Sequence, residues 1–113
     1  MEKCQKKSRI KRLVEEGDIV LAGIVIAELL QGPLDSADER VVSSVLSNFR
    51  CLDAPREIFE QAGLLSLDLK RRGLPIPLSD CLIAAQAIHD SCVLVTADRH
   101  FERFPQLNLL LLE

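Results

Sequence analysis

The spacing of apolar side chains predicts that helices and short strands alternate along the chain. Residues 3–16 have a helical pattern that ends at Gly17, and residues 18–23 form an apolar run with the length of a strand. A second helix is predicted over residues 24–31, because its apolar pattern stops at the Gly32-Pro33 pair. The chain is therefore expected to open with a helix, a strand and a helix.

Helix-start signals mark three further helices. Ser36 and Glu39 have the spacing of a capping box ahead of the apolar positions Val42, Val45, Leu46 and Phe49. Pro55 opens a long helix, whose apolar stripe consists of Ile58, Ala62, Leu65 and Leu69. Ser79 is the predicted N-cap of another helix, over residues 80–88.

Three apolar runs complete the pattern as predicted strands. They lie at residues 50–53, 93–95 and 107–112, and a short helical turn is predicted over residues 99–104. Strands that alternate with helices and are apolar throughout are typical of an α/β protein with a parallel sheet covered on both faces. Ligands bind outside the carboxyl ends of such strands, so Asp98 is expected at the functional edge of the sheet.

Size and composition predict a single domain over residues 1–113. With 48% hydrophobic residues the chain can form one core, and no linker, repeat or low-complexity tract divides it. Its longest apolar run, near residues 107–112, is far too short to span a membrane, and the N-terminus lacks the apolar region of a secretory signal. We therefore expect a cytoplasmic protein.

The cysteines are widely spaced and form no C-x-x-C pair; they are Cys4, Cys51, Cys81 and Cys92. Because a reducing cytosol disfavours disulfides, we interpret them as small buried hydrophobic residues. The alternative is a zinc site made of His89, Cys92 and His100, although no pair among these three has a familiar zinc-ligand spacing.

The charge of the chain gives no general signal for nucleic-acid binding, since the formal net charge is −3. The basic residues are nevertheless uneven. One group is Lys3, Lys6, Lys7, Arg9, Lys11 and Arg12, and another is Lys70, Arg71 and Arg72. Such patches can hold phosphates even on an acidic protein, and solvated helix faces are the alternative interpretation.

Three acids stand in unusual surroundings. Asp98 follows an apolar strand closely, Asp80 begins a helix that is otherwise nearly all apolar, and Glu28 has only hydrophobic neighbours. Each also has a purely structural interpretation. Asp80 can help to cap its helix, Asp98 can be the N-cap of the turn that follows, and Glu28 can lie on the one solvated stripe of its helix.

Taken together, the three acids indicate a metal site. Two helices and one strand end of the same α/β unit would bring carboxylates to one rim, where they repel each other unless a cation lies between them. Mg²⁺ or Mn²⁺ suits this arrangement, because such ions bind carboxylate oxygens and keep waters and substrate phosphates as their remaining ligands. A metal-activated water could then attack a phosphodiester.

The tract from residue 80 to residue 105, DCLIAAQAIHDSCVLVTADRHFERFP, resembles the C-terminal half of a PIN domain, especially of VapC-type toxin ribonucleases. The matching features are Asp80 before the LIAA segment, and a strand that ends in Thr96-x-Asp98 with Phe101 nearby. The segment VLAGIVIAELLQG, from residue 20, resembles the second strand and following helix of the family, and it places Glu28 at an acidic position of the site.

The resemblance implies a PIN-like fold of three α/β/α layers and a Mg²⁺- or Mn²⁺-dependent endoribonuclease, the toxin of a type II toxin–antitoxin pair. By the same resemblance, Asp80 would be the strongest metal ligand and Asp98 a second-site or water-mediated ligand. Glu28 would bind the metal or orient water, and the Thr96 hydroxyl would position a carboxylate or a water. The implied partners are an RNA substrate, a cognate antitoxin and a second copy of the chain.

The sequence departs from the family pattern at its N-terminus. PIN domains open with an apolar strand that ends in a metal-binding Asp, whereas residues 1–17 have no such strand. We therefore expect the metal site to lack one carboxylate and two strands to lack a hydrogen-bonding neighbour.

Two other functions remain open at the level of sequence. One is a catalytically impaired PIN-like protein that binds an antitoxin or RNA without cleaving it. The other is an unrelated flavodoxin-like domain, for which residues 21–25 are a poor phosphate loop because they lack the expected Gly or Ser/Thr enrichment.

Overall fold

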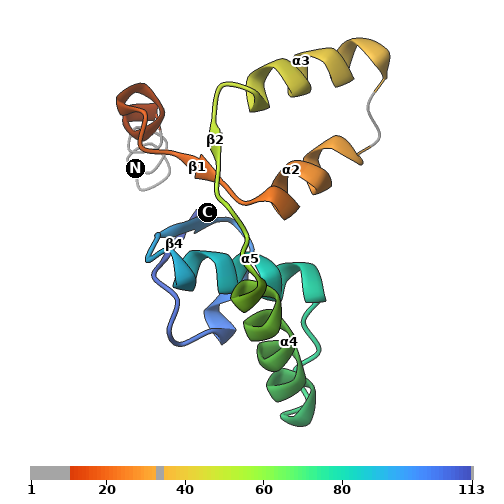
Figure 1. Ribbon diagram of the computed structural model, residues 1–113, viewed down its shortest axis with the longest axis vertical. Helices are drawn as coiled ribbons and strands as arrows, with labels where there is room; N and C mark the ends of the chain where they lie inside the picture. The colour runs from red at the N-terminus through yellow and green to blue at the C-terminus, as the bar shows by residue number, and fades with distance from the viewer. Residues whose placement is uncertain (1–10, 33–34, 113) are drawn as a thin grey trace. The chain divides into compact units, whose positions relative to one another are not determined.

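The computed structural model of the protein describes residues 11–32 and 35–112 (Figure 1). The chain forms two compact units, one up to Asp53 and the other from Ala54 onward. Several features predicted from the sequence lie outside the described residues, namely positions 3–10 of the first helix, Pro33, Cys4 and most of the N-terminal basic group. The prediction of a single domain remains a prediction.

The N-terminal unit consists of short elements in the predicted order. Residues 11–16 are helical, and Gly17 ends this helix with a φ of +75°, a conformation that glycine adopts without steric cost. Strand β1 (Val20–Leu21), helix α2 (Gly23–Leu30), helix α3 (Ser36–Leu46) and strand β2 (Arg50–Cys51) follow. The two strands pair in parallel, with Val20 opposite Arg50 and Leu21 opposite Cys51.

The C-terminal unit contains two long helices and a second strand pair. Helices α4 (Arg56–Arg71) and α5 (Leu78–His89) pack against each other (Figure 1). Strand β3 (Leu94–Thr96), the 3₁₀ helix η1 (Arg99–Arg103) and strand β4 (Leu109–Leu111) complete the unit. The strands β3 and β4 are parallel, with Leu94 opposite Leu109 and Thr96 opposite Leu111.

All the buried residues of the described chain lie in the C-terminal unit. Three of the four predicted stripe positions of α4 are buried, Ile58, Ala62 and Leu69, whereas Leu65 is half-buried. Helix α5 contributes mainly small side chains to this core, which let the two helices approach closely; they are Cys81, Ala84, Ala85 and Ala87, with Ile83.

The described N-terminal unit has no buried residue at all. Its helix α2, GIVIAELL, has Glu28 as its one polar side chain and is otherwise apolar, a composition typical of a helix that is mostly covered. Large apolar side chains such as Leu29, Val41 and Val45 are exposed instead. This unit therefore cannot gain its stability from a core of its own.

The strand pairing is parallel, as predicted. Within the described residues, however, the strands form two separate two-stranded sheets and not one. Each of these four strands consequently has a paired neighbour on one side only.

Two predicted helix caps are wrong. Asp35, not Ser36, caps α3, because its carboxylate accepts a hydrogen bond of 2.8 Å from the Asp38 N–H. Pro77, not Ser79, precedes the first residue of α5: its carbonyl accepts the Asp80 N–H at 3.0 Å, and no side chain caps this helix. In both cases an earlier residue already fixes the first turn.

The cysteine prediction is correct for Cys81, which is fully buried, and wrong for Cys51, which is exposed. Cys51 ends the two-residue strand β2, both of whose residues are exposed. Cys92 is half-buried, and all three of these cysteines are free thiols. No helix among the described residues has both the length and the apolar character that a membrane span requires.

The core gives a direct test of the fold through two adjacent residues of α4. Ile58 is 1% exposed and Phe59 is 56% exposed. We expect Ile58→Ala to lower the free energy of unfolding by about 2–5 kcal/mol, because it leaves a cavity between α4 and α5. Phe59→Ala should change it by only about 0.5 kcal/mol, as is usual at the surface. Urea unfolding followed by circular dichroism measures both, and equal losses would contradict the assigned core.

Candidate metal centre

The turn after strand β3 fixes the position of Asp98. The Asp98 backbone N–H donates a hydrogen bond of 3.1 Å to Thr96 Oγ1, and Asp98 Oδ1 accepts one of 2.9 Å from the His100 backbone N–H. Asp98 is thus the N-cap of η1, as its structural interpretation predicted. The Thr96 hydroxyl contacts the backbone of Asp98, and its contact with a carboxylate or a water stays a prediction.

Helix α5 positions the second carboxylate, Asp80, in its first turn. The Asp80 side chain is only 14% exposed, and the next residue, Cys81, is completely buried in the core. An acid in the first turn is favoured by the positive end of the helix dipole. The packing that buries Cys81 therefore also holds Asp80 at the edge of the C-terminal unit.

The side chains of Asp80, Asp98 and His100 meet at this edge, and we call them the DDH cluster. One ligand atom of each lies within 4.8 Å of the other two. His100 Nδ1 is 3.4 Å from Asp98 Oδ1 and 3.8 Å from Asp80 Oδ2. Among the described residues, this is the one such group of potential ligands.

The donor set of the DDH cluster fits a divalent cation. Two carboxylates at this separation repel each other, and a cation between them removes that repulsion. Donors on opposite sides of one ion bound at about 2.1 Å lie about 4.2 Å apart, so small side-chain rotations bring these three atoms to coordinating positions. Two oxygens and one imidazole nitrogen suit a metal that also keeps open positions for water or substrate.

The buried thiol beside the cluster is not suited to join it. Burial raises the pKa of Cys81, and the nearby charge of Asp80 raises it further, whereas a hydrogen bond with Ser66 and the charge of Lys70 act in the opposite direction. Since only the thiolate is a good metal ligand, Cys81 stays a neutral core residue. The cluster offers oxygen and nitrogen donors.

The other predicted site residues have different environments. Glu28 lies exposed on α2 in the N-terminal unit, and it is not part of the DDH cluster, which the C-terminal unit forms alone. The zinc alternative finds no support, because His89 and Cys92 belong to no group of three potential ligands among the described residues. His89 Nδ1 lies 3.4 Å from Asp90 Oδ1 instead.

His100 was not predicted as a member of this cluster. The sequence analysis names it only in the zinc alternative, with His89 and Cys92. The available signal was the position of His100, two residues after Asp98, the expected N-cap. An aspartate in that position accepts a hydrogen bond from the backbone N–H two residues later, which brings that residue close to the carboxylate.

Comparison with known proteins shows the family to which this chain belongs. The family model described as "PIN domain" matches residues 5–107. Ribonuclease VapC2 of Rickettsia felis is 31% identical over 107 residues, which cover 90% of this chain and 80% of that protein. The chain belongs to the PIN domain family, as its C-terminal motif indicated. PIN nucleases generally depend on divalent metal ions, which agrees with the acidic character of the cluster.

Solved structures show the same relationship. The crystal structure of VapBC2 from Rickettsia felis bound to a promoter DNA fragment contains a chain that superposes with a TM-score of 0.76 at 30% identity, over 94% of this chain and 86% of that one. A chain of DNA-bound VapBC from Salmonella typhimurium also gives a TM-score of 0.76, at 28% identity and over 88% and 80% of the two chains. VapBC-1 from nontypeable Haemophilus influenzae shares the fold, with a TM-score of 0.74 at 24% identity over 94% and 88% of the chains.

The cluster predicts specific binding of one divalent cation per chain, which Mn²⁺ can report through its paramagnetic resonance signal. His100→Ala should weaken Mn²⁺ binding at least about tenfold, because even the loss of a group that only supports a ligand costs this much. The matched control is His89→Ala, which removes the other histidine of the chain and should leave Mn²⁺ binding unchanged. Equal binding by the wild-type protein and both variants would exclude His100 from the site.

Proposed function

We propose that this protein is a divalent-metal-dependent endoribonuclease and the toxin of a type II toxin–antitoxin pair. The observation that carries the proposal is the DDH cluster, two carboxylates and an imidazole gathered within 4.8 Å in a chain of the PIN domain family. The ribonuclease name of the Rickettsia felis relative supports the same class of activity.

In this proposal, Asp80 and Asp98 hold the metal ion, Mg²⁺ or Mn²⁺. Asp80 is the strongest ligand, since its carboxylate is the less exposed of the two and is held by the first turn of α5. Asp98 binds directly or through a water. His100 adds a nitrogen donor, which Mn²⁺ accepts more readily than Mg²⁺ does.

Glu28 and Thr96 complete the proposed site. Glu28 supplies a further carboxylate that binds the metal or orients a water, and this role rests on the family pattern around α2. Thr96 acts through its hydroxyl, which fixes the backbone of Asp98 at 3.1 Å and so sets where the Asp98 carboxylate points. Loss of this hydroxyl should therefore affect the metal ligand indirectly.

The proposed reaction is hydrolysis of an RNA phosphodiester. A metal ion held by Asp80 and Asp98 would make a bound water more acidic and would stabilise negative charge on the phosphate oxygens. The water oxygen forms a new bond to phosphorus, the bond from phosphorus to the 3′ oxygen breaks, and the 3′ oxygen leaves with a proton. The products are a 5′-phosphate and a 3′-hydroxyl, and the 2′-hydroxyl of the RNA does not react.

The proposed protein partner is a cognate antitoxin, and the proposed assembly includes a homodimer in the cytoplasm. The solved relatives are VapBC complexes, two of them with DNA bound. The exposed apolar side chains of the N-terminal unit, such as Leu29 and Val45, give this chain surface that such partners can cover.

RNA cleavage by the purified full chain tests the proposal. We expect cleavage of a mixed RNA substrate with Mg²⁺ or Mn²⁺, and a loss of about 100-fold or more in Asp80→Asn, which removes a charge that supports the transition state. The matched control is Glu60→Gln, which neutralises an exposed acid on α4 that pairs with Arg56. It should cleave like the wild-type protein.

The chemistry of the new ends distinguishes this enzyme from a contaminant. Ends with 5′-phosphates that form only with metal and require Asp80 support the proposal. Cyclic 2′,3′-phosphate ends, or equal cleavage by wild-type protein and Asp80→Asn, would refute catalysis by this chain. The alternative function, a PIN-like protein that binds RNA or an antitoxin without cutting, would then be the better account.

A further inference from the structure

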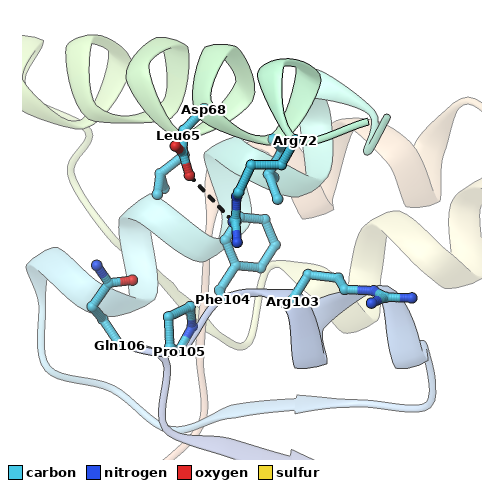
Figure 2. Close-up of a pocket in the computed structure, with 8 residues that line it drawn as sticks. Leu65, Asp68, Arg72, Arg103, Phe104, Pro105 and Gln106 are labelled. Carbon is cyan, nitrogen blue, oxygen red and sulfur yellow. Dashed lines mark ion pairs between the residues drawn. The ribbon is translucent and has the colours of Figure 1, made fainter. Parts of the chain in front are cut away.

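The C-terminal unit also contains a concave site, to which η1 contributes Arg103. It is a pocket of about 260 Å³ between the last turns of α4 and the segment that follows η1 (Figure 2). Leu65, Leu69 and Phe104 make its apolar wall, and Pro105 lies at its edge. Two guanidinium side chains, Arg72 and Arg103, also line it.

The charge at this pocket favours an anion. Its charged lining residues are Arg72, Arg103 and Asp68, so the formal charge is positive by one unit. Arg72 Nη2 lies 3.2 Å from Asp68 Oδ2, and this pair is half-exposed. An arginine has five N–H donors in a fork, so one ion pair leaves most of the guanidinium available to a second oxyanion.

Arg103 is the less restrained of the two arginines. Within the described part of the chain, no hydrogen bond or ion pair of its guanidinium is found. Figure 2 shows Arg72 reaching from α4 toward Phe104, while the guanidinium of Arg103 extends away from that ring at the rim. The stem of Arg103 therefore lines the pocket and its charged end is available to solvent.

The geometry of η1 links this pocket to the DDH cluster. In a 3₁₀ helix, residues three apart lie on the same side and about 6 Å apart along the axis. Two such pairs on η1 and its C-cap show this register: Arg99 Nη1 lies 3.1 Å from Glu102 Oε1, and the rings of Phe101 and Phe104 have centroids 6.1 Å apart. His100 and Arg103 are the next pair of the same kind.

We propose that Arg72 and Arg103 form a phosphate-binding subsite for the RNA strand, one or two nucleotides away from the phosphate at the DDH cluster. One turn of η1 advances about 6 Å and stacked nucleotides advance about 3.4 Å each, so this turn spans about two nucleotides. The inference rests on the proposed ribonuclease function. It gives the two arginines a positioning role, since they hold a phosphate that does not react.

An acidic segment of a protein partner is the other anion that two guanidinium groups could bind. The structure favours RNA because Arg103 and His100 project from the same side of one short helix, so a single strand can reach both. A guanidinium fork also matches two oxygens of a phosphate. The two arginines and the DDH cluster would then bind phosphates of the same RNA strand.

The test is the salt dependence of RNA binding by the full chain. Fluorescence anisotropy with a labelled single-stranded RNA is measured from 50 to 200 mM salt in a chelator, so that the RNA stays intact. One phosphate contact on a single strand contributes about 0.7 to the slope of log K against log salt. The double variant Arg72→Gln/Arg103→Gln should lose about this amount, which changes the ratio of affinities at the two salt concentrations roughly threefold.

Two matched variants separate a specific contact from general charge. Arg56→Gln removes an exposed arginine at the start of the same helix, and it should keep the wild-type slope. Arg103→Lys keeps the positive charge at the rim of the pocket, so it should keep most of the wild-type salt slope. Circular dichroism shows whether each variant is folded.

The inference and the proposed function fail in different ways. If the wild-type protein neither binds nor cleaves RNA, the proposed function itself is refuted. If the wild-type protein binds and cleaves RNA but the double variant keeps its salt slope, or loses no more than Arg56→Gln does, the subsite is refuted. An acidic protein segment would in that case be the better occupant of the pocket.

Discussion

The close packing of α4 against α5 is the contact on which the C-terminal unit depends. Small residues of α5, including Cys81 and Ala84, are fully buried and let Ile58 and Leu69 of α4 approach the helix. This contact fixes the rotation of α5 about its axis, and so fixes the direction of Asp80 in its first turn. The buried rings of Phe101 and Phe104 hold η1 in the same way, and η1 carries His100. The DDH cluster is therefore a consequence of the core, assembled from two elements whose own positions are set by apolar packing.

The DDH cluster places two carboxylates and an imidazole at the edge of the C-terminal unit. The His100 ring lies 3.4 Å and 3.8 Å from the two carboxylates, so it can pair with them when it is protonated or share a metal with them when it is neutral. The N-terminal unit exposes apolar surface where the cluster exposes charge. Its helices α2 and α3 have no buried residue among the described ones. The first feature suits a cation, and the second suits covering contacts that this unit does not make alone.

Much of this arrangement could be predicted from the sequence. The order of elements, the parallel pairing, the α/β class and the PIN family are confirmed, because apolar periodicity and the Asp80, Thr96 and Asp98 motif depend on local spacing. The proximity of Asp80 and Asp98 followed from the same topology. The cap at Ser36 was wrong because the neighbouring Asp35 competes for the same N–H groups, and spacing alone does not rank the two. The cap at Ser79 was wrong because α5 begins one residue earlier, after Pro77, and no side chain caps it. The place of His100 was missed, although it follows from the turn that Asp98 makes as an N-cap. The roles of Glu28 and Thr96 in the site stay predictions.

The central claim is that Asp80, Asp98 and His100 bind a divalent metal ion together. The most direct measurement is an anomalous difference map from a crystal of the full chain soaked in Mn²⁺, with data collected on both sides of the manganese absorption edge. The account predicts one strong peak within coordination distance of both carboxylates, with His100 Nδ1 or Nε2 turned toward it. A map with no peak at these residues, while Mn²⁺ binds elsewhere on the same chain, would contradict it.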